Sequence, residues 1–109
     1  MTNPQDLECS AFESIVITMT MSPVEDITGW TLEAHFRDRP VGSTPTLLLT
    51  RSGVLSDPTN GVATFAIVSS ETGTTLGAGD FDYDIWRIDA GSEKRLVWGE
   101  LSVRDQQWQ

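Results

Sequence analysis

Residues 60–85 read NGVATFAIVSSETGTTLGAGDFDYDI, and they carry the clearest structural pattern in the chain. Asn60-Gly61 is a strong turn signal, and the alternating segment 62–68 that follows is typical of a β-strand. A second strand is predicted over residues 81–88. The glycine-rich segment between the two strands predicts a crossing from one β-sheet to another.

The crossing over residues 69–79 is predicted to hold one helical turn. Ser69 or Ser70 is placed to cap that turn, with Glu71 and Thr72 in its first residues. Three glycines argue against a longer helix. Leu76 is the only large apolar residue in the segment, so we expect it to plug one end of the core.

Further short strands are indicated on both sides of this stretch. Residues 30–37 alternate most cleanly, with Trp30, Leu32, Ala34 and Phe36 on one side and polar residues on the other. The other strand-like segments are residues 15–21, 47–50, 54–55 and 94–103. We therefore predict an all-β protein, an immunoglobulin-like antiparallel β-sandwich of about seven short strands with Greek-key links. A small closed barrel is the alternative.

The chain has 109 residues, which is enough for one domain. We expect that domain over residues 12–104, with a flexible N-terminal arm over 1–11 and a polar tail over 105–109. No signal-peptide pattern is seen near Met1, so we expect synthesis in the cytoplasm. Cys9 is the only cysteine, which rules out an internal disulfide and favours an inert thiol.

The net charge is −9, from 16 acidic and 7 basic residues. Such a field repels phosphate backbones and anionic lipid, so we expect neither nucleic acid nor membrane as a partner. The charge suits a soluble chain or a partner with a basic surface.

Asp80, Asp82 and Asp84 fall on one face of their strand, about 6–7 Å apart. They are weak metal candidates, because a bound Ca²⁺ needs several oxygens at about 2.3–2.6 Å. A glycosidase pair is disfavoured too, because an open strand face has no apolar pocket to raise one carboxyl pKa. A solvated face that discourages edge pairing is the preferred interpretation. We expect no bound cofactor.

His35, Trp86 and Trp108 are the interface candidates. His35 is the only histidine and points outward on its strand, and no Gly-x-Ser-x-Gly nucleophile motif accompanies it. Trp86 lies on the acidic side of its strand, and Trp108 lies in the polar tail. An outward tryptophan marks either a protein interface or a platform for a carbohydrate or other ligand.

Several pieces of the chain follow one another in a recognisable order. They are Asp26-Ile27-Thr28-Gly29-Trp30, Ala34-His35-Phe36-Arg37, Leu49-Thr50, Asn60-Gly61-Val62, Glu71-Thr72 with Leu76 and Gly79, Tyr83-Asp84-Ile85, and Leu96-Val97-Trp98-Gly99-Glu100-Leu101-Ser102-Val103. In order and spacing, over residues 12–104, they resemble short structural proteins of tailed phages and prophages, including the N-terminal domains of some baseplate and tail proteins. Ile27 stands where that pattern usually has Leu, and residues 73–75 stand where it often has alanines and a proline.

The resemblance implies a structural role without catalytic residues. It implies a homo-oligomeric subunit or adaptor that meets other virion or tail-type proteins and becomes associated with the particle after synthesis. The motif residues are then expected to maintain the fold, with Gly29, Gly61 and Gly79 giving backbone freedom. Trp30, Phe36, Phe65, Leu76 and Tyr83 are expected in the core.

Overall fold

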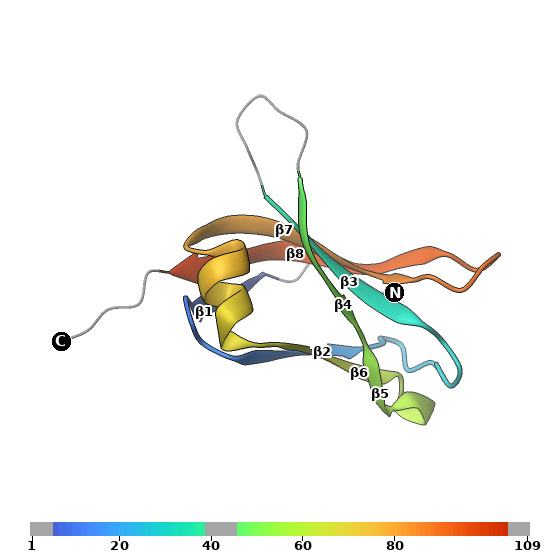
Figure 1. The fold of residues 1–109 in the computed structure, drawn as a ribbon. Coiled ribbons are helices and arrows are strands. Elements are labelled where there is room, and N and C mark those ends of the chain that lie inside the picture. Colours follow the sequence, from blue (N-terminus) through green and yellow to red (C-terminus); the bar gives the residue numbers. More distant parts are fainter. Residues whose placement is uncertain (1–5, 39–45, 105–109) are drawn as a thin grey trace.

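Two β-sheets packed face to face form the protein, as the computed structural model of residues 6–38 and 46–104 shows (Figure 1). The larger sheet has the order β1 (Leu7–Ser10), β8 (Lys94–Arg104), β7 (Gly79–Arg87), β3 (Leu32–Arg37), β4 (Leu47–Ser52). The smaller sheet has the order β2 (Ile15–Thr20), β6 (Val62–Ile67), β5 (Val54–Asp57). The all-β prediction is confirmed. The described residues form eight strands where about seven were predicted, and one strand pair is parallel.

That parallel pair corrects the predicted N-terminal arm. Leu7–Ser10 forms β1, which runs parallel to β8 and places Leu7 beside Leu101 and Cys9 beside Val103. The segment is ordered because Leu7 and Cys9 alternate toward the core, where Cys9 is 6% exposed. Glu8, on the other side, accepts a 2.7 Å hydrogen bond from Arg104 Nε. Residues 1–5 of the predicted arm and the predicted tail over 105–109 lie outside the described residues.

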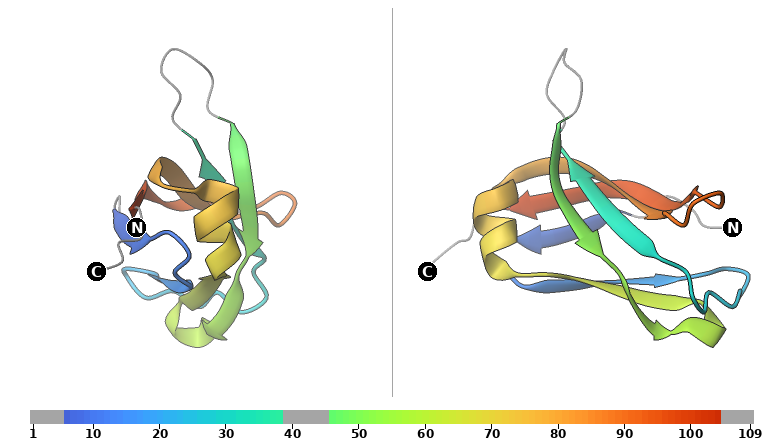
Figure 2. Two further views of the ribbon diagram at one scale, coloured as in Figure 1. Left: turned by 60° about the vertical axis from the view of Figure 1, so that its left-hand side comes forward. Right: turned by 45° about the vertical axis from the view of Figure 1, so that its right-hand side comes forward.

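The chain passes between the sheets at both sides of the sandwich. Residues 11–14 connect β1 of the larger sheet to β2 of the smaller one. On the other side β4 continues through Gly53 into β5, so that one ribbon leaves the larger sheet and joins the smaller (Figure 2). A Cβ at Gly53 would lie 2.7 Å from the Phe65 ring, so the crossing needs a residue without a side chain.

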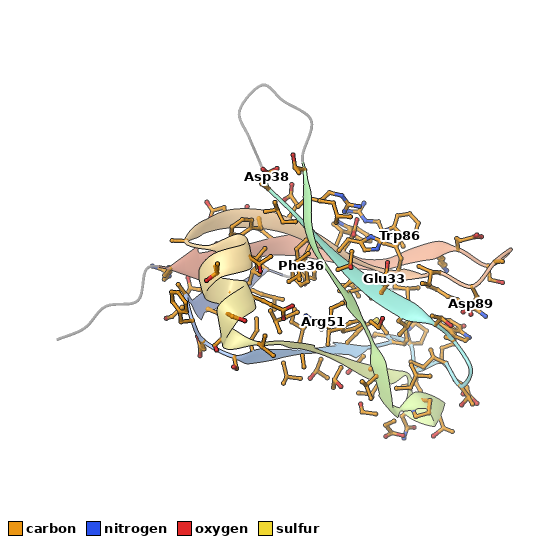
Figure 3. The ribbon with its side chains drawn as sticks, in the orientation of Figure 1. Glu33, Phe36, Asp38, Arg51, Trp86 and Asp89 are labelled. Carbon is orange, nitrogen blue, oxygen red and sulfur yellow. The ribbon has the colours of Figure 1, made fainter. Side chains whose placement is uncertain are left out.

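The core lies between the inner faces of the two sheets. β3 contributes Leu32, Ala34 and Phe36, which confirms the alternation predicted there. Phe36 stacks on Tyr83 of β7 with ring centroids 6.0 Å apart, and it points into the space between the sheets (Figure 3). Phe65 of β6 is fully buried. Trp30 and Leu76, also predicted in the core, are partly buried and pack against it.

The predicted helical crossing is confirmed as a π-helix, η2 (Glu71–Leu76), which lies at one end of the sandwich between β6 and β7 (Figure 2). Its fully buried residue is Thr72, whereas Leu76 is only partly buried. The Thr72 hydroxyl is satisfied there, because it lies 2.9 Å from the Glu13 carbonyl and 3.1 Å from that of Ser69. Ser70, at the N-cap, makes no side-chain capping bond. The Glu71 carboxylate instead accepts the Val68 N–H at 3.0 Å.

The turn predicted at Asn60-Gly61 is confirmed, because Asn60 ends a short 3-10 helix, η1 (Pro58–Asn60), and Gly61 caps it in the left-handed conformation. A register shift between Ile85 and Trp86 changes which side chains of β8 face the core. Leu96 and Val97 are neighbours in the sequence and are both buried, so Leu96 does not share the outward face of Trp98 as strict alternation would require. A β-bulge has this effect because it breaks the two-residue alternation of a strand.

Candidate functional site

The candidate site is the outer face of the larger sheet, which we call the charged face. Pairing of β3 with β7 and of β7 with β8 places its outward residues side by side. They are Glu33, His35, Arg37, Asp80, Asp82, Asp84, Trp86, Arg95, Trp98 and Glu100. Two of the three interface candidates, His35 and Trp86, thus lie on one surface with all three aspartates. Trp108 lies outside the described residues.

Asp84 is the centre of this face. Arg37 Nη1 donates to its Oδ1 at 3.1 Å, and Arg95 Nε lies 3.6 Å from its Oδ2. These two cations come from the strands on either side of β7, and they cover Asp84 so that the residue is 8% exposed. The prediction of a wholly solvated aspartate face is therefore wrong at Asp84. Burying a carboxylate to this extent costs little free energy only when cations or hydrogen-bond donors surround it.

His35 lies between two carboxylates and is hydrogen-bonded to one of them. Its Nε2 lies 2.7 Å from Glu33 Oε1, and its Nδ1 lies 3.7 Å from Asp84 Oδ1 without forming a hydrogen bond. In the neutral tautomer that donates from Nε2, the Nδ1 lone pair faces the Asp84 carboxylate.

Two tryptophans border the charged cluster. Trp98 is directly opposite Asp84 on β8, and the Arg95 guanidinium lies 4.9 Å from the centroid of its ring. Trp86 is opposite Glu33 on β3 and Arg95 on β8, and it stands on the outer side of the sheet (Figure 3). Both rings are partly buried. Stacking of a guanidinium on an aromatic ring limits the freedom of both side chains.

A shallow pocket of about 440 Å³ opens on this face. Its walls include Trp98, the arginines Arg37 and Arg95, and the carboxylates of Asp6, Asp82, Asp84 and Glu100. Four acids against two arginines make the pocket negative. At one side of the pocket, the Asp6 carboxylate accepts a hydrogen bond from the Glu100 N–H at 3.1 Å.

The three aspartates are not brought together as ligands. The Ser102 hydroxyl donates to Asp80 at 3.0 Å, while Asp84 is occupied by Arg37 and Arg95. Within residues 6–38 and 46–104, no group of three or more His, Cys, Asp or Glu side chains is placed to hold a metal ion. No helix in that part of the chain is both long enough and apolar enough to cross a membrane.

Two titratable groups that are not part of the Asp84 cluster have a raised pKa. Burial, followed by the nearby Glu13 and Glu8, raises the pKa of the Cys9 thiol. A thiol with a raised pKa forms little of the nucleophilic thiolate, which fits the inert cysteine predicted from the sequence. Burial also raises the pKa of Tyr83 to about 12, and the Asp6 carboxylate adds to that shift.

Sequence reasoning did not identify Glu33, Arg37, Arg95 or Trp98 as members of the site. The available signal was the two-residue alternation of each strand, which predicts that these side chains point outward. The sequence does not show the register between strands, and only the pairing of His35 with Asp84 and of Asp84 with Trp98 brings the groups into contact. No family model and no curated protein matches this sequence.

Proposed function

We propose that this protein is a non-enzymatic structural or adaptor subunit of a phage-type particle, in its tail, its baseplate or a head-associated position. It acts through protein–protein contacts. It is made in the cytoplasm and then joins the particle, and with a net charge of −9 it engages neither nucleic acid nor membrane. The proposal rests first on the ordered motifs over residues 12–104 that resemble tailed-phage structural proteins.

The strand arrangement supports an immunoglobulin-like Greek-key sandwich, the finer part of the fold proposal. Strands β2, β6 and β5 form one sheet, and β8, β7, β3 and β4 form the other, with β1 parallel to β8. After β2 the strands follow one another in pairs, β3 and β4, then β5 and β6, then β7 and β8, and successive pairs alternate between the sheets, as in Greek-key sandwiches. This fold recurs in many binding proteins, so the surface, and not the fold, has to carry the function.

The structural observation that supports the proposal is the composition of the charged face. Tryptophan and arginine are the residues most enriched among those that dominate binding energy at protein interfaces. Here Trp86, Trp98, Arg37 and Arg95 share one surface, and Asp84 holds both arginines in place. Side chains already fixed before binding lose less conformational entropy when a partner covers them.

The test is co-expression with the products of neighbouring genes, followed by size exclusion with light scattering. We expect a stable complex with a head, tail or baseplate protein. Trp98→Ala on the charged face should weaken it at least tenfold, the size of effect seen at interface hot spots. Val54→Ala is the matched control, because Val54 is 65% exposed on the other sheet.

A chain that binds none of these products and lies among metabolic genes would count against the proposal. So would a complex that Trp98→Ala and Val54→Ala weaken equally, because the charged face would then have no special part in binding.

A carbohydrate- or ligand-binding module is the second candidate, favoured by the pocket beside Trp98. Aromatic rings pack on sugar faces, and carboxylates such as Asp82 and Glu100 in its wall accept hydrogen bonds from hydroxyl groups. Calorimetric titration with a glycan panel, with and without Ca²⁺, separates the two candidates. A glycan that binds, or a Ca²⁺-dependent rise in melting temperature, would favour the binding module. If both responses are absent, the binding module is ruled out.

A further inference from the structure

Four strands lie at the edges of the two sheets, and three of them carry features that block pairing with another chain. β1 has only four residues and carries Glu8, which is bonded to Arg104. The pairing of β4 with β3 is interrupted by a register shift, and β4 carries Arg51. β5 has four residues, a register shift, and Asp57 followed by Pro58. Short strands, charges, prolines and bulges are the usual protection of a sheet edge.

β2 is the edge strand that lacks all of these features. It has six residues, IVITMT, without a charge, proline or glycine, and it pairs with β6 from Ile15 to Thr20 in an unbroken register. Within residues 6–38 and 46–104, its other edge has no hydrogen-bond partner. A regular, uncharged strand rich in β-branched residues is a template for a further strand.

A groove lies along this edge, between β2 and β1. Its volume is about 400 Å³, and all six residues of β2 line it. Tyr83, Ile85 and Val97 from the inner face of the larger sheet also line it, as do the acidic residues Glu8 and Glu13. The unpaired edge therefore borders a partly apolar hollow, and an added strand would cover both.

The outward surface beside this edge is uncharged as well. Val16, Thr18 and Thr20 of β2 are exposed on the outer face of the smaller sheet, next to Thr64 and Ala66 of β6. Val16 is 64% exposed. This surface contrasts with the charged face on the other sheet.

We propose that β2 pairs antiparallel with β2 of a second copy of this chain, which joins the two smaller sheets into one sheet of six strands. Two chains of net charge −9 repel each other, so they associate best through a strand that itself carries no charge, and β2 is such a strand. The acids nearest to it lie off the strand: Glu8 of β1 and Glu13, which precedes β2, line the groove beside it, and Glu25 lies beyond its other end.

Side-chain chemistry also fits a second copy. In an antiparallel pair, directly opposite residues share a face of the sheet. In every such register of β2 on its copy, the opposite residues on the inner side are Ile or Met in both strands. On the outer side they are Val or Thr in both strands. A twofold axis between the two strands makes the contact self-complementary and closes it at a dimer. The pairing is independent of the charged face.

The test measures mass and backbone protection on the full chain. Light scattering over a wide concentration range should show a rise to twice the 12.0 kDa of one chain. Amide hydrogen exchange should slow with concentration at alternate residues of β2, because only their N–H groups point to the free edge. A mass of one chain throughout, with rapid exchange at those amides, would overturn the proposal.

Thr18→Lys is the variant and Thr64→Lys its matched control. The two threonines are directly opposite each other on β2 and β6, so both changes add the same charge to the same face, and only one adds it at the edge. We expect Thr18→Lys to weaken the dimer about tenfold through like charges brought close together. Thr64→Lys should change it by less than about twofold.

Equal effects of the two lysines would overturn edge pairing and indicate face-to-face packing of the uncharged surfaces. Val16→Lys, at another exposed position of β2, repeats the test if Thr18→Lys fails to fold. A groove that instead binds a strand of another protein, with the chain itself monomeric, would also overturn self-pairing. None of these variants alters the charged face, so failure here leaves the proposed function standing.

Discussion

Asp84 faces outward from β7, yet its side chain is only 12% exposed. Arg37 and Arg95 on the neighbouring strands cover it, and His35 approaches from β3. A buried carboxylate held in this way determines where both arginines point. The single residue therefore links the stability of the larger sheet to the shape of its surface.

Asp84→Asn should lower the free energy of unfolding by about 1–2 kcal/mol, because it leaves two arginines beside an uncharged amide. Asp80→Asn is the matched control on the same strand and face. Asp80 is exposed, and within residues 6–38 and 46–104 its side chain is bonded to the Ser102 hydroxyl alone, so its change should cost about 0.5 kcal/mol or less. Urea denaturation measures both. Equal losses would show that the arginines do not depend on Asp84.

Asp89 gives the protein a defined response to acid. Its carboxylate accepts hydrogen bonds from Arg87 Nε at 2.8 Å and from the Thr31 N–H at 2.9 Å, and these lower its pKa from 3.8 to about 2. Because the folded pKa lies below the unfolded one, the stabilisation is complete above the unfolded pKa. It is lost as the pH falls through the folded value.

Asp89→Asn should therefore melt at a lower temperature than the natural chain at neutral pH, and the gap should close as the pH falls from about 4 to about 2. Thermal unfolding followed by circular dichroism across that range measures the gap. A constant difference at every pH would mean that the carboxylate charge contributes nothing and that the change acts through packing.

At the scale of elements, the turn after η1 shows why particular glycines are needed. Gly61 has φ +72°, and a Cβ there would lie 2.7 Å from the backbone oxygen of Glu25. Gly29 has a similar φ of +83°, but a Cβ there would meet nothing within 4 Å. The two positions share the left-handed backbone and differ in the space around it.

Gly29→Ala should cost about 1 kcal/mol from backbone strain alone. Gly61→Ala should cost at least twice as much, because the backbone at Glu25 cannot rotate away as a long side chain can. Urea denaturation of both variants measures the difference. Similar losses would show that the turn relaxes enough to admit a methyl group.

The elements predicted well from sequence are those whose pattern is local. β3 alternates cleanly, and β6 follows an Asn-Gly turn, so both were placed close to their observed bounds. β1 was missed because four residues between polar neighbours give almost no periodic signal, and the strand depends on its pairing with β8. Likewise the bulge that buries Leu96 follows from a register shift that no local pattern reveals.

The same limit applies to the site. The outward direction of Asp84 and His35 could be predicted from two-residue alternation. Their contact could not, because it requires β3 and β7 to be neighbours in one sheet, although β4, β5, η1, β6 and η2 lie between them along the chain. The sequence therefore predicted which side chains are outward, and the topology determines which of them meet.

As a whole molecule, the sandwich has two chemically different sides. The outer face of the larger sheet gathers ionised and aromatic side chains around Asp84. The outer face of the smaller sheet, at β2 and the adjoining β6, carries valines, threonines and an alanine. The two proposals use these sides separately: the uncharged side for contact with a second copy, and the charged face for contact with a different protein.

The net charge of −9 acts on the whole molecule as self-repulsion, which added salt screens. The melting temperature should therefore rise with sodium chloride. Glu25 tests the cause, because it is exposed and the structure gives its side chain no partner among the described residues. Glu25→Lys makes the net charge two units less negative. It should raise the low-salt melting temperature by about 2–3 °C and reduce the dependence of the melting temperature on salt. Glu25→Gln should fall midway. A melting temperature that decreases with salt would show that attractive ion pairs, such as those at Asp84, outweigh the repulsion.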